Sequence, residues 1–493
     1  MRWLIALGLA LTLAAPLAAQ EDNLRAGIDA FNKGDLTAAI IAFQKVTAAA
    51  PEDVTGWLWL GTALVRKSDA QAAAEALTRA TTLAPENFDA WLNLGLAYMG
   101  MGKLEQAEAA YKKAVTLDPK SAEAKFNLAN SYLEQKKWLS AIASYREAVA
   151  LDPNHAPAHH NLAVALQRNG DEEGALEEYR KAAKLAPQDA MFQYHLGLSA
   201  RSAGKIEEAL AALEAALKLD PSIKEVHLDF GLALYAKGRF QQAADEFREA
   251  LKANPQDFLA HYNLGLVLAR MGKRPDGIKA YQEALKVRPS DALALNNLAC
   301  LLIEDRRPTD AVPLLESAVK ASPRYFLARQ NLAIAYAQKG DEDRAIKEWQ
   351  ALEKADPANA RAREALGAWH LRAGRLEAAH QEYAEVVRLE PKNAAALNNL
   401  GLVCERMGKL DDALAHLRTA LKVNPKYALA YNNIGIVYER LGRKSEAIWA
   451  YKTALKLDPK FREAKDNLQR LQPAAESAPA PAQPAAPKEK RGG

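Results

Sequence analysis

The sequence predicts an all-α fold, a right-handed superhelical solenoid of thirteen tandem helix-turn-helix repeats followed by a capping helix. Three observations predict it. Prolines recur every 34 residues, small residues recur at fixed positions between them, and apolar residues follow a helical spacing. Length alone would suggest about three globular domains, but an unbroken period indicates a repetitive array instead.

Proline marks the boundaries between repeats. Each recurring proline follows an apolar stretch of helix-forming residues. Because proline lacks an amide hydrogen and clashes with the preceding turn, each one ends a helix and begins a turn. The prolines that stand 34 residues apart are Pro51, Pro85, Pro119, Pro153, Pro187, Pro221, Pro255, Pro289, Pro323, Pro357, Pro391, Pro425 and Pro459.

We number the positions of each repeat from 1 to 34, with Gln20 at position 1 of the first repeat. Position 8 is always glycine or alanine, position 20 is alanine except for Gly277, and position 24 is usually large, as in Tyr111. Positions 4, 7, 8 and 11 share one face of a first helix, and positions 20, 24 and 27 share one face of a second. Small residues therefore let the two helices approach closely, and the pairs must stack to bury their apolar faces.

Glycine near position 15, as in Gly34, is expected to supply the turn after the first helix. Three repeats depart from this pattern, with Ser68, Lys136 and Arg306 at the turn, and Pro275 stands near the second helix of another repeat. We expect these departures to soften the array locally without breaking it.

This pattern resembles the tetratricopeptide-repeat family over residues 20–461, about nine-tenths of the chain. The resemblance implies stacked helix pairs with a groove lined by the first helices. Beyond the repeats, residues 462–472 are expected to form the capping helix, with Leu468 and Leu471 docked on the last repeat. Gln469 stands at position 8 there, where no second helix could pack closely. Residues 473–493 are rich in proline and alanine and are expected to be a disordered or extended tail.

Residues 1–19 are expected to be a signal peptide. Arg2 precedes a short apolar run, and small residues ending at Ala19 follow it. The run is shorter than the roughly 20 residues that span a bilayer, and no other run is long enough. Export to the periplasm or the extracellular space is therefore favoured, and an uncleaved N-terminal anchor is the alternative.

Composition and motifs argue against several functions. The formal net charge is +4 without a basic stripe, so no nucleic-acid partner is expected. Cys300 and Cys404 lie about three repeats apart and are interpreted as small buried apolar residues rather than a disulfide pair. No nucleotide-binding, hydrolase or metalloprotease motif occurs, so no enzyme activity and no cofactor are expected.

Histidines offer a weak alternative. His155, His159 and His160 are close in sequence, and histidines four residues apart on a helix can bind a metal. His159, however, stands at position 4, where tryptophans such as Trp57 occupy the same place in other repeats. Packing is therefore the favoured role, and no metal site is expected.

Position 6 of the first helix carries the candidate binding site, a row of asparagines with a break at His195 and Asp229 and another at Ala365. An amide offers one acceptor and two donors, so each asparagine could pair with the backbone of an extended peptide. The alternative is that these side chains bond to neighbouring helices and stabilise the stack. The asparagines of the predicted peptide-binding groove are Asn93, Asn127, Asn161, Asn263, Asn297, Asn331, Asn399 and Asn433.

The asparagine row resembles the binding surface of one repeat family and differs from that of another. It resembles the repeat region of O-linked N-acetylglucosamine transferases, in which such asparagines hold peptide backbone, but no catalytic domain follows here. Chaperone-adaptor repeats instead grip a terminal carboxylate with a lysine at position 2, where this chain has residues such as Asp89, Glu123 and Leu259.

The sequence thus predicts an exported scaffold that binds extended or helical segments of a protein or peptide partner in its concave groove. A self-associating structural envelope protein, and a non-catalytic repeat subunit of a glycosyltransferase-like complex, are the alternatives.

Overall fold

The computed structural model describes residues 20–475, so the expected signal peptide and the tail beyond residue 475 lie outside the described part. The chain divides into two units, Met1–Pro255 and Gln256–Gly493, and each is considered by itself. Within the described ranges of both units, helices joined by turns account for the regular structure, with no strand.

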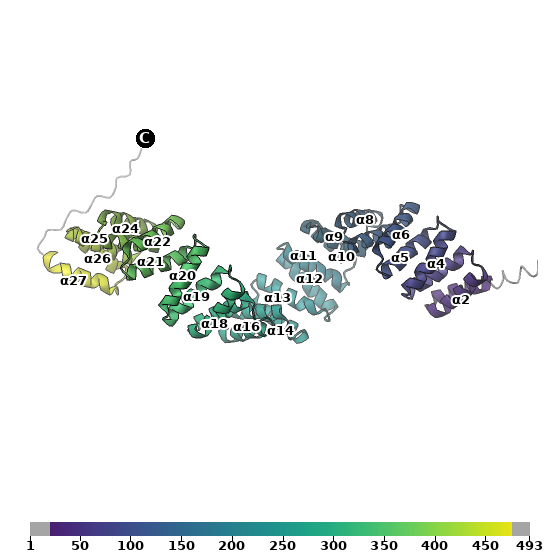
Figure 1. Ribbon diagram of the computed structural model, residues 1–493, viewed down its shortest axis with the longest axis horizontal. Helices are drawn as coiled ribbons and strands as arrows, with labels where there is room; N and C mark the ends of the chain where they lie inside the picture. The colour runs from purple at the N-terminus through teal and green to yellow at the C-terminus, as the bar shows by residue number, and fades with distance from the viewer. Residues whose placement is uncertain (1–19, 476–493) are drawn as a thin grey trace, which may run out of the picture. The chain divides into compact units, whose positions relative to one another are not determined.

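In the first unit, helices follow one another in antiparallel pairs, drawn from purple to teal in Figure 1. Residues 20–32 form the first helix of the first repeat. The first helices of the later repeats are α3 (Val54–Arg66), α5 (Phe88–Gly100), α7 (Ala122–Glu134), α9 (Ala156–Arg168), α11 (Ala190–Ser202) and α13 (Lys224–Ala236). The second helices are α2 (Leu36–Ala49), α4 (Ala70–Leu83), α6 (Leu104–Leu117), α8 (Trp138–Leu151), α10 (Glu172–Leu185), α12 (Ile206–Leu219) and α14 (Phe240–Ala253).

The second unit repeats this arrangement. Its first helices are α15 (Phe258–Arg270), α17 (Ala292–Glu304), α19 (Phe326–Lys339), α21 (Ala360–Arg372), α23 (Ala394–Arg406) and α25 (Ala428–Arg440). Its second helices are α16 (Arg274–Val287), α18 (Pro308–Ala321), α20 (Glu342–Ala355), α22 (Leu376–Leu389), α24 (Leu410–Val423) and α26 (Lys444–Leu457), and α27 (Arg462–Ala475) comes last. The tandem helix pairs confirm the predicted solenoid class.

Each first helix packs on the second helix of its own repeat, and each second helix packs on the first helix of the next repeat within its unit. Neighbouring first helices also touch, as α17 does α19 and α23 does α25. The first helices of a unit therefore lie side by side in a row, and side chains of adjacent first helices meet.

Glycine at position 8 allows the close approach within a pair, as the sequence predicts. A Cβ added to Gly95 would lie 2.4 Å from a ring carbon of Tyr111, and one added to Gly435 would lie 2.5 Å from Tyr451. Both tyrosines are almost completely buried. The aromatic ring at position 24 thus lies directly on the backbone of the first helix.

The turn between the two helices of a repeat requires a left-handed backbone. Ten glycines adopt positive φ there, and Ser68, Lys136 and Arg306 adopt it at 65°, 59° and 59°. These three are the departures noted in the sequence. Because a side chain crowds the backbone in this region, each costs about 1–2 kcal/mol relative to glycine. The helices on either side keep their length, so the strain is local.

The helix after the last repeat is longer than expected. The sequence predicts its end at residue 472, but α27 continues through Pro473 to Ala475. Leu468 and Leu471 are buried and pack in one cluster with Tyr451, whereas Gln469 is exposed. The apolar side of α27 therefore covers the end of the array, and its other side is polar.

Candidate functional site

The eight asparagines of position 6 all lie on first helices. Asn433 is buried, with 6 % of its surface exposed, and the other seven are half-buried. Most of these side chains are therefore partly covered by a neighbouring first helix and partly open to solvent. α5, α7 and α9 carry Asn93, Asn127 and Asn161, and α15, α17, α19, α23 and α25 carry Asn263, Asn297, Asn331, Asn399 and Asn433.

In the second unit, amide side chains connect neighbouring first helices. Nδ2 of Asn331 on α19 donates to Oδ1 of Asn296 on α17 at 2.8 Å. Nδ2 of Asn433 on α25 donates to Oδ1 of Asn398 on α23 at 2.9 Å. Both bonds join position 5 of one repeat to position 6 of the next, 35 residues later. We call such a bond a rung.

Two further rungs complete this set in the second unit. Asn467 of α27 donates to Asn432 of α25 at 3.1 Å, so the last helix is held in the same way. Asn297 of α17 donates to the hydroxyl of Tyr262 on α15 at 3.0 Å. The residue at position 5 can therefore differ, provided that it offers an acceptor.

The first break in the asparagine row does not interrupt the rungs. His160 of α9 meets His195 of α11, with 2.5 Å between Nε2 and Nδ1. Tyr194 of α11 donates from its hydroxyl to Asp229 of α13 at 2.8 Å. At both residues of this break, titratable side chains replace the amides.

Three asparagines of the row make no hydrogen bond to another side chain among residues 20–475. Nδ2 of Asn93 donates to the carbonyl oxygen of Asp89 at 2.9 Å, and Nδ2 of Asn263 to that of Leu259 at 2.8 Å. Both bonds stay within the asparagine's own helix. No hydrogen bond involves the side chain of Asn127 within residues 20–475. We call Asn93, Asn127 and Asn263 the open amides.

The row is therefore not a set of eight equivalent sites. Asn161 donates to Asn130 at 3.0 Å, and Oδ1 of Asn399 accepts from its neighbour Asn398 at 3.3 Å. The rungs favour the stacking role for the asparagines that form them, and peptide binding stays a prediction for the open amides. The asparagines at position 5 were missed, although the sequence carries their signal as Asn-Asn pairs at residues 296–297, 398–399 and 432–433.

In several repeats, the side chain at position 4 attaches the first helix to the turn before it. Nε1 of Trp57 donates to the carbonyl oxygen of Pro51 at 2.9 Å, and Nε1 of Trp91 to that of Pro85 at 2.8 Å. His159 makes the same contact, with 3.1 Å between Nε2 and the oxygen of Pro153. In these repeats the bond holds the start of the first helix against the turn that the proline begins.

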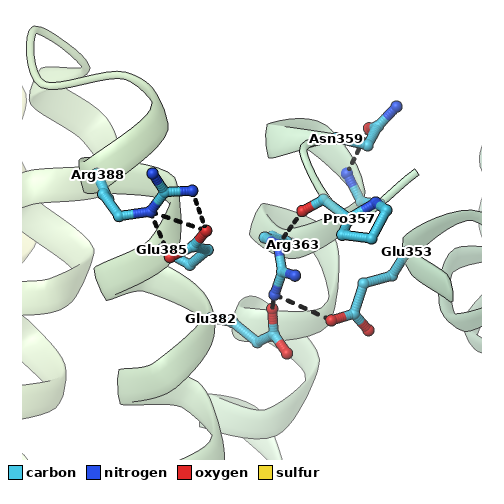
Figure 2. Close-up of polar contacts among 8 residues, drawn as sticks. Glu353, Pro357, Asn359, Arg363, Glu382, Glu385 and Arg388 are labelled. Carbon is cyan, nitrogen blue, oxygen red and sulfur yellow. Dashed lines mark hydrogen bonds and ion pairs between the residues drawn. The ribbon is translucent and has the colours of Figure 1, made fainter.

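In some repeats the position-4 side chain also binds a glutamate on the second helix. Arg363 donates from Nε to the oxygen of Pro357 at 2.8 Å, and Nη1 lies 2.9 Å from both Glu382 and Glu353 (Figure 2). Burial, together with the charge of Glu353, raises the pKa of Glu382 above its ordinary value, against the lowering effect of Arg363. One guanidinium thus serves two carboxylates and a backbone oxygen.

His159 likewise contacts both a proline oxygen and a glutamate of the second helix. Its Nδ1 lies 2.5 Å from the carboxylate of Glu178 on α10. Only 6 % of His159 is exposed, so its ring lies within the repeat. No group of three or more His, Cys, Asp or Glu side chains that could hold a metal occurs among residues 20–475.

The solvent-facing side of the row varies at position 2. In the first unit, Asp89 and Glu123 are exposed and form no ion pair with any described residue, whereas Met191 is an exposed apolar residue at the same position. In the second unit, Leu259, Leu293 and Leu327 stand at that position with 47 %, 51 % and 49 % of their surfaces exposed. Position 2 precedes position 6 by one helical turn, so each of these side chains lies beside an asparagine of the row.

Four repeat families match segments between residues 198 and 460. Families described as tetratricopeptide repeat match residues 392–460, 262–326 with 370–413, and 302–369. A family described as TPR repeat matches residues 198–238 and 231–272. The chain is a tetratricopeptide-repeat protein. Residues 15–195 of this tetratricopeptide-repeat protein also match the cilia and flagella-associated protein 70 C-terminal domain.

Solved structures with similar folds include other tetratricopeptide-repeat proteins. YrrB, described as a TPR protein with an unusual peptide-binding site, is 24% identical over 38% of this chain and 96% of its own, with a TM-score of 0.36. The Cut9–Hcn1 hetero-tetramer is 15% identical over 92% and 96%, with a TM-score of 0.38. MamA is 28% identical over 33% and 95%, with a TM-score of 0.32. No curated protein sequence matches the chain.

Membership in this repeat family supports a protein–protein interaction scaffold, and the fold is typically non-catalytic. Among residues 20–475, no helix of this tetratricopeptide-repeat protein has both the length and the apolar character needed to cross a membrane.

Proposed function

We propose that this protein is an exported scaffold that holds extended segments of partner proteins along the first helices. The observation that carries the proposal is the pair of open amides on consecutive first helices, Asn93 on α5 and Asn127 on α7. The amide of Asn93 keeps its carbonyl oxygen and one N–H available, and that of Asn127 keeps all its groups. A peptide backbone offers the matching acceptor and donor.

Charge favours a basic segment at this place. Asp89 and Glu123 lie one turn before the two open amides and have no cationic partner within the described residues. α5 contains no lysine or arginine, and the single lysine of α7, Lys125, is paired with Glu147. Unpaired carboxylates beside backbone-binding amides suit a segment that carries lysine or arginine.

The second unit would hold a different segment. Leu259 adjoins the open amide Asn263, and Leu293 and Leu327 continue its row on α17 and α19. These exposed leucines suit apolar side chains of a partner, whereas the amides of Asn297 and Asn331 are engaged in rungs. Each unit would thus recognise its own kind of segment.

The proposal of export rests on residues 1–19 alone. A cleaved signal peptide gives a mature chain that begins at Gln20 and fractionates outside the cytoplasm. An uncleaved anchor gives a full-length chain in the membrane fraction. Mass spectrometry of the purified native protein, together with cell fractionation, distinguishes the two, and a full-length chain in the cytoplasm would overturn export altogether.

Photo-crosslinking in the native host tests the binding face. A photoreactive amino acid replaces Glu123 on the proposed face of α7 in one variant and Arg146 on the exposed side of α8 in the matched control. We expect a partner adduct only from position 123. Its cross-linked peptide should be basic, and an adduct with a second copy of the chain would instead support self-association.

A second pair of variants tests the open amides. Replacing Asn93 and Asn127 with alanine should weaken that adduct and the affinity for the mapped peptide by about tenfold or more, since two hydrogen-bonding groups are lost. The matched control replaces Asn154 and Asn169, two exposed asparagines outside the row. Equal affinity of a folded N93A/N127A variant and the control would reject the amides as the binding groups.

A further inference from the structure

A chain of hydrogen bonds runs across four helices in the first unit. The hydroxyl of Tyr145 on α8 and Nδ2 of Asn161 on α9 both donate to Oδ1 of Asn130 on α7. Oδ1 of Asn161 lies 3.1 Å from Nδ1 of His160. Nε2 of His160 lies 2.5 Å from Nδ1 of His195 on α11. The chain therefore ends in the rung between the two imidazoles.

The chain fixes the direction of each hydrogen bond. Because Nδ2 of Asn161 donates to Asn130, its Oδ1 must be the acceptor toward His160, and Nδ1 of His160 carries the proton. In a neutral ring, the other nitrogen then holds a lone pair. Nε2 of His160 is thus the acceptor in the rung, and Nδ1 of His195 is the donor.

Protonation removes this acceptor. An imidazolium has two N–H donors and no lone pair, so a protonated His160 cannot accept from His195. Protonation of His195 alone would leave the rung intact but places a charge in a half-buried site. The centroids of the two rings lie only 4.8 Å apart, so two positive charges would repel each other strongly at this position.

Few charges are available to compensate. The ionisable groups that face the pair are Tyr179 of α10 and Tyr194 of α11, together with Asp189, which caps α11. Asp229 of α13 is engaged with Tyr194 in the next rung. Burial lowers the pKa of His160, and this outweighs the raising effects of its hydrogen bond to Asn161 and of Asp189. Burial and the charge of His160 lower the pKa of His195 to about 4, against the raising effect of Asp189.

We propose that the His160–His195 rung is a pH-sensitive joint between the two repeats that contain α9 and α11, closed at neutral pH and opened by acid. The neighbouring Tyr194–Asp229 rung is different, because a protonated carboxyl keeps an oxygen that can accept from the tyrosine. The rungs of the second unit join amides to one another or to a tyrosine hydroxyl, and neither group titrates in acid. Acid should therefore loosen the junction between α9 and α11 and leave the other junctions unchanged.

The direction of the pH effect follows from the linkage between proton binding and stability. An imidazole in an opened joint titrates near its ordinary pKa of about 6.5, whereas His195 in the closed joint titrates at about 4. Between these values the opened form binds more protons. The closed joint is therefore fully stable above about pH 6.5 and loses stability as the pH falls toward about 4.

Hydrogen exchange of the full chain tests the joint. After correction for intrinsic exchange, amides of α9 and α11 should lose protection by on the order of tenfold between about pH 7.5 and pH 5, while those of α23 and α25 should not. The variant H160N/H195N installs the amide pair found at Asn398 and Asn433, and it should abolish the difference. An equal loss of protection in this variant, or none in the parent, would overturn the proposal.

A second measurement does not depend on the variant. In the parent chain labelled at its nine histidines, nuclear magnetic resonance should find two coupled imidazoles that titrate below the ordinary pKa of about 6.5. Single substitutions His160→Gln and His195→Gln assign their signals. Titration of both rings at or above the ordinary value would also overturn the joint.

Discussion

Nδ2 of Asn433 donates a 2.9 Å hydrogen bond to Oδ1 of Asn398, and both side chains are buried. This bond is one of the four rungs of the second unit. A substitution of one partner leaves the other amide buried without its bond, which typically costs about 1–3 kcal/mol. N433A should therefore destabilise the α23–α25 junction by that amount.

Hydrogen exchange of α23 and α25 measures this cost locally, which suits a repeat array that need not unfold in one step. The double variant N398A/N433A provides the coupling between the two side chains. Additive effects of the two single substitutions would mean that the bond contributes nothing of its own.

Gly435 and Gly367 occupy the same position in their repeats but differ in the space around them. An added Cβ would lie 2.5 Å from the ring of Tyr451 at Gly435, but 3.1 Å from the ring of Tyr383 at Gly367. G435A should cost about 1–3 kcal/mol through overpacking. G367A should cost less, because its Cβ approaches the ring less closely while the gain of about 1 kcal/mol from the helix propensity of alanine is the same at both positions. Thermal unfolding of both variants gives the comparison, and a larger loss in G367A would contradict it.

Trp57 and His159 donate to the same proline carbonyl in their respective repeats, but only His159 has a glutamate, Glu178, across from it. The repeat with Trp57 has Ala76 in that place. H159W alone should destabilise its repeat, because Glu178 loses its imidazole partner in a half-buried site. The double variant H159W/E178A should recover most of the loss, by about 1–2 kcal/mol. Urea unfolding measures it, and no recovery would reject the pairing.

Arg363 holds Glu382 and Glu353 together (Figure 2). R363Q should lower stability by about 1–3 kcal/mol at neutral pH, since two half-buried carboxylates lose their cation. The pKa of Glu382 is already raised in the folded chain, and this contribution to stability is lost as the pH rises through that pKa. The loss in R363Q should therefore shrink toward about pH 5 as Glu382 takes up a proton.

Thermal unfolding of R363Q and the parent across this pH range checks the prediction. Arg388, which pairs with Glu385 on the exposed side of α22, offers a matched control, because water screens an exposed ion pair and its removal should change stability little. A pH-independent loss in R363Q would show that the effect comes from packing rather than charge.

Much of the fold follows from residues close together in sequence. The recurring prolines end helices through their own backbone, and the apolar spacing within each helix selects the face that is buried. Glycine at position 8 and an aromatic residue at position 24 are only 16 positions apart, so their contact lies within one repeat. These features depend on local geometry, and the sequence by itself determined them. It did not determine the end of α27, because Pro473 stays within the helix.

Only the tertiary structure decided which hydrogen bonds each asparagine of the row makes. The sequence predicts one row of equivalent amides, but Asn331 and Asn433 are engaged by asparagines 35 residues earlier, while Asn93 and Asn127 are not. Whether an amide is free depends on the side chain that the preceding repeat places against it. That partner is fixed by how neighbouring first helices pack, and the same packing places His160 against His195.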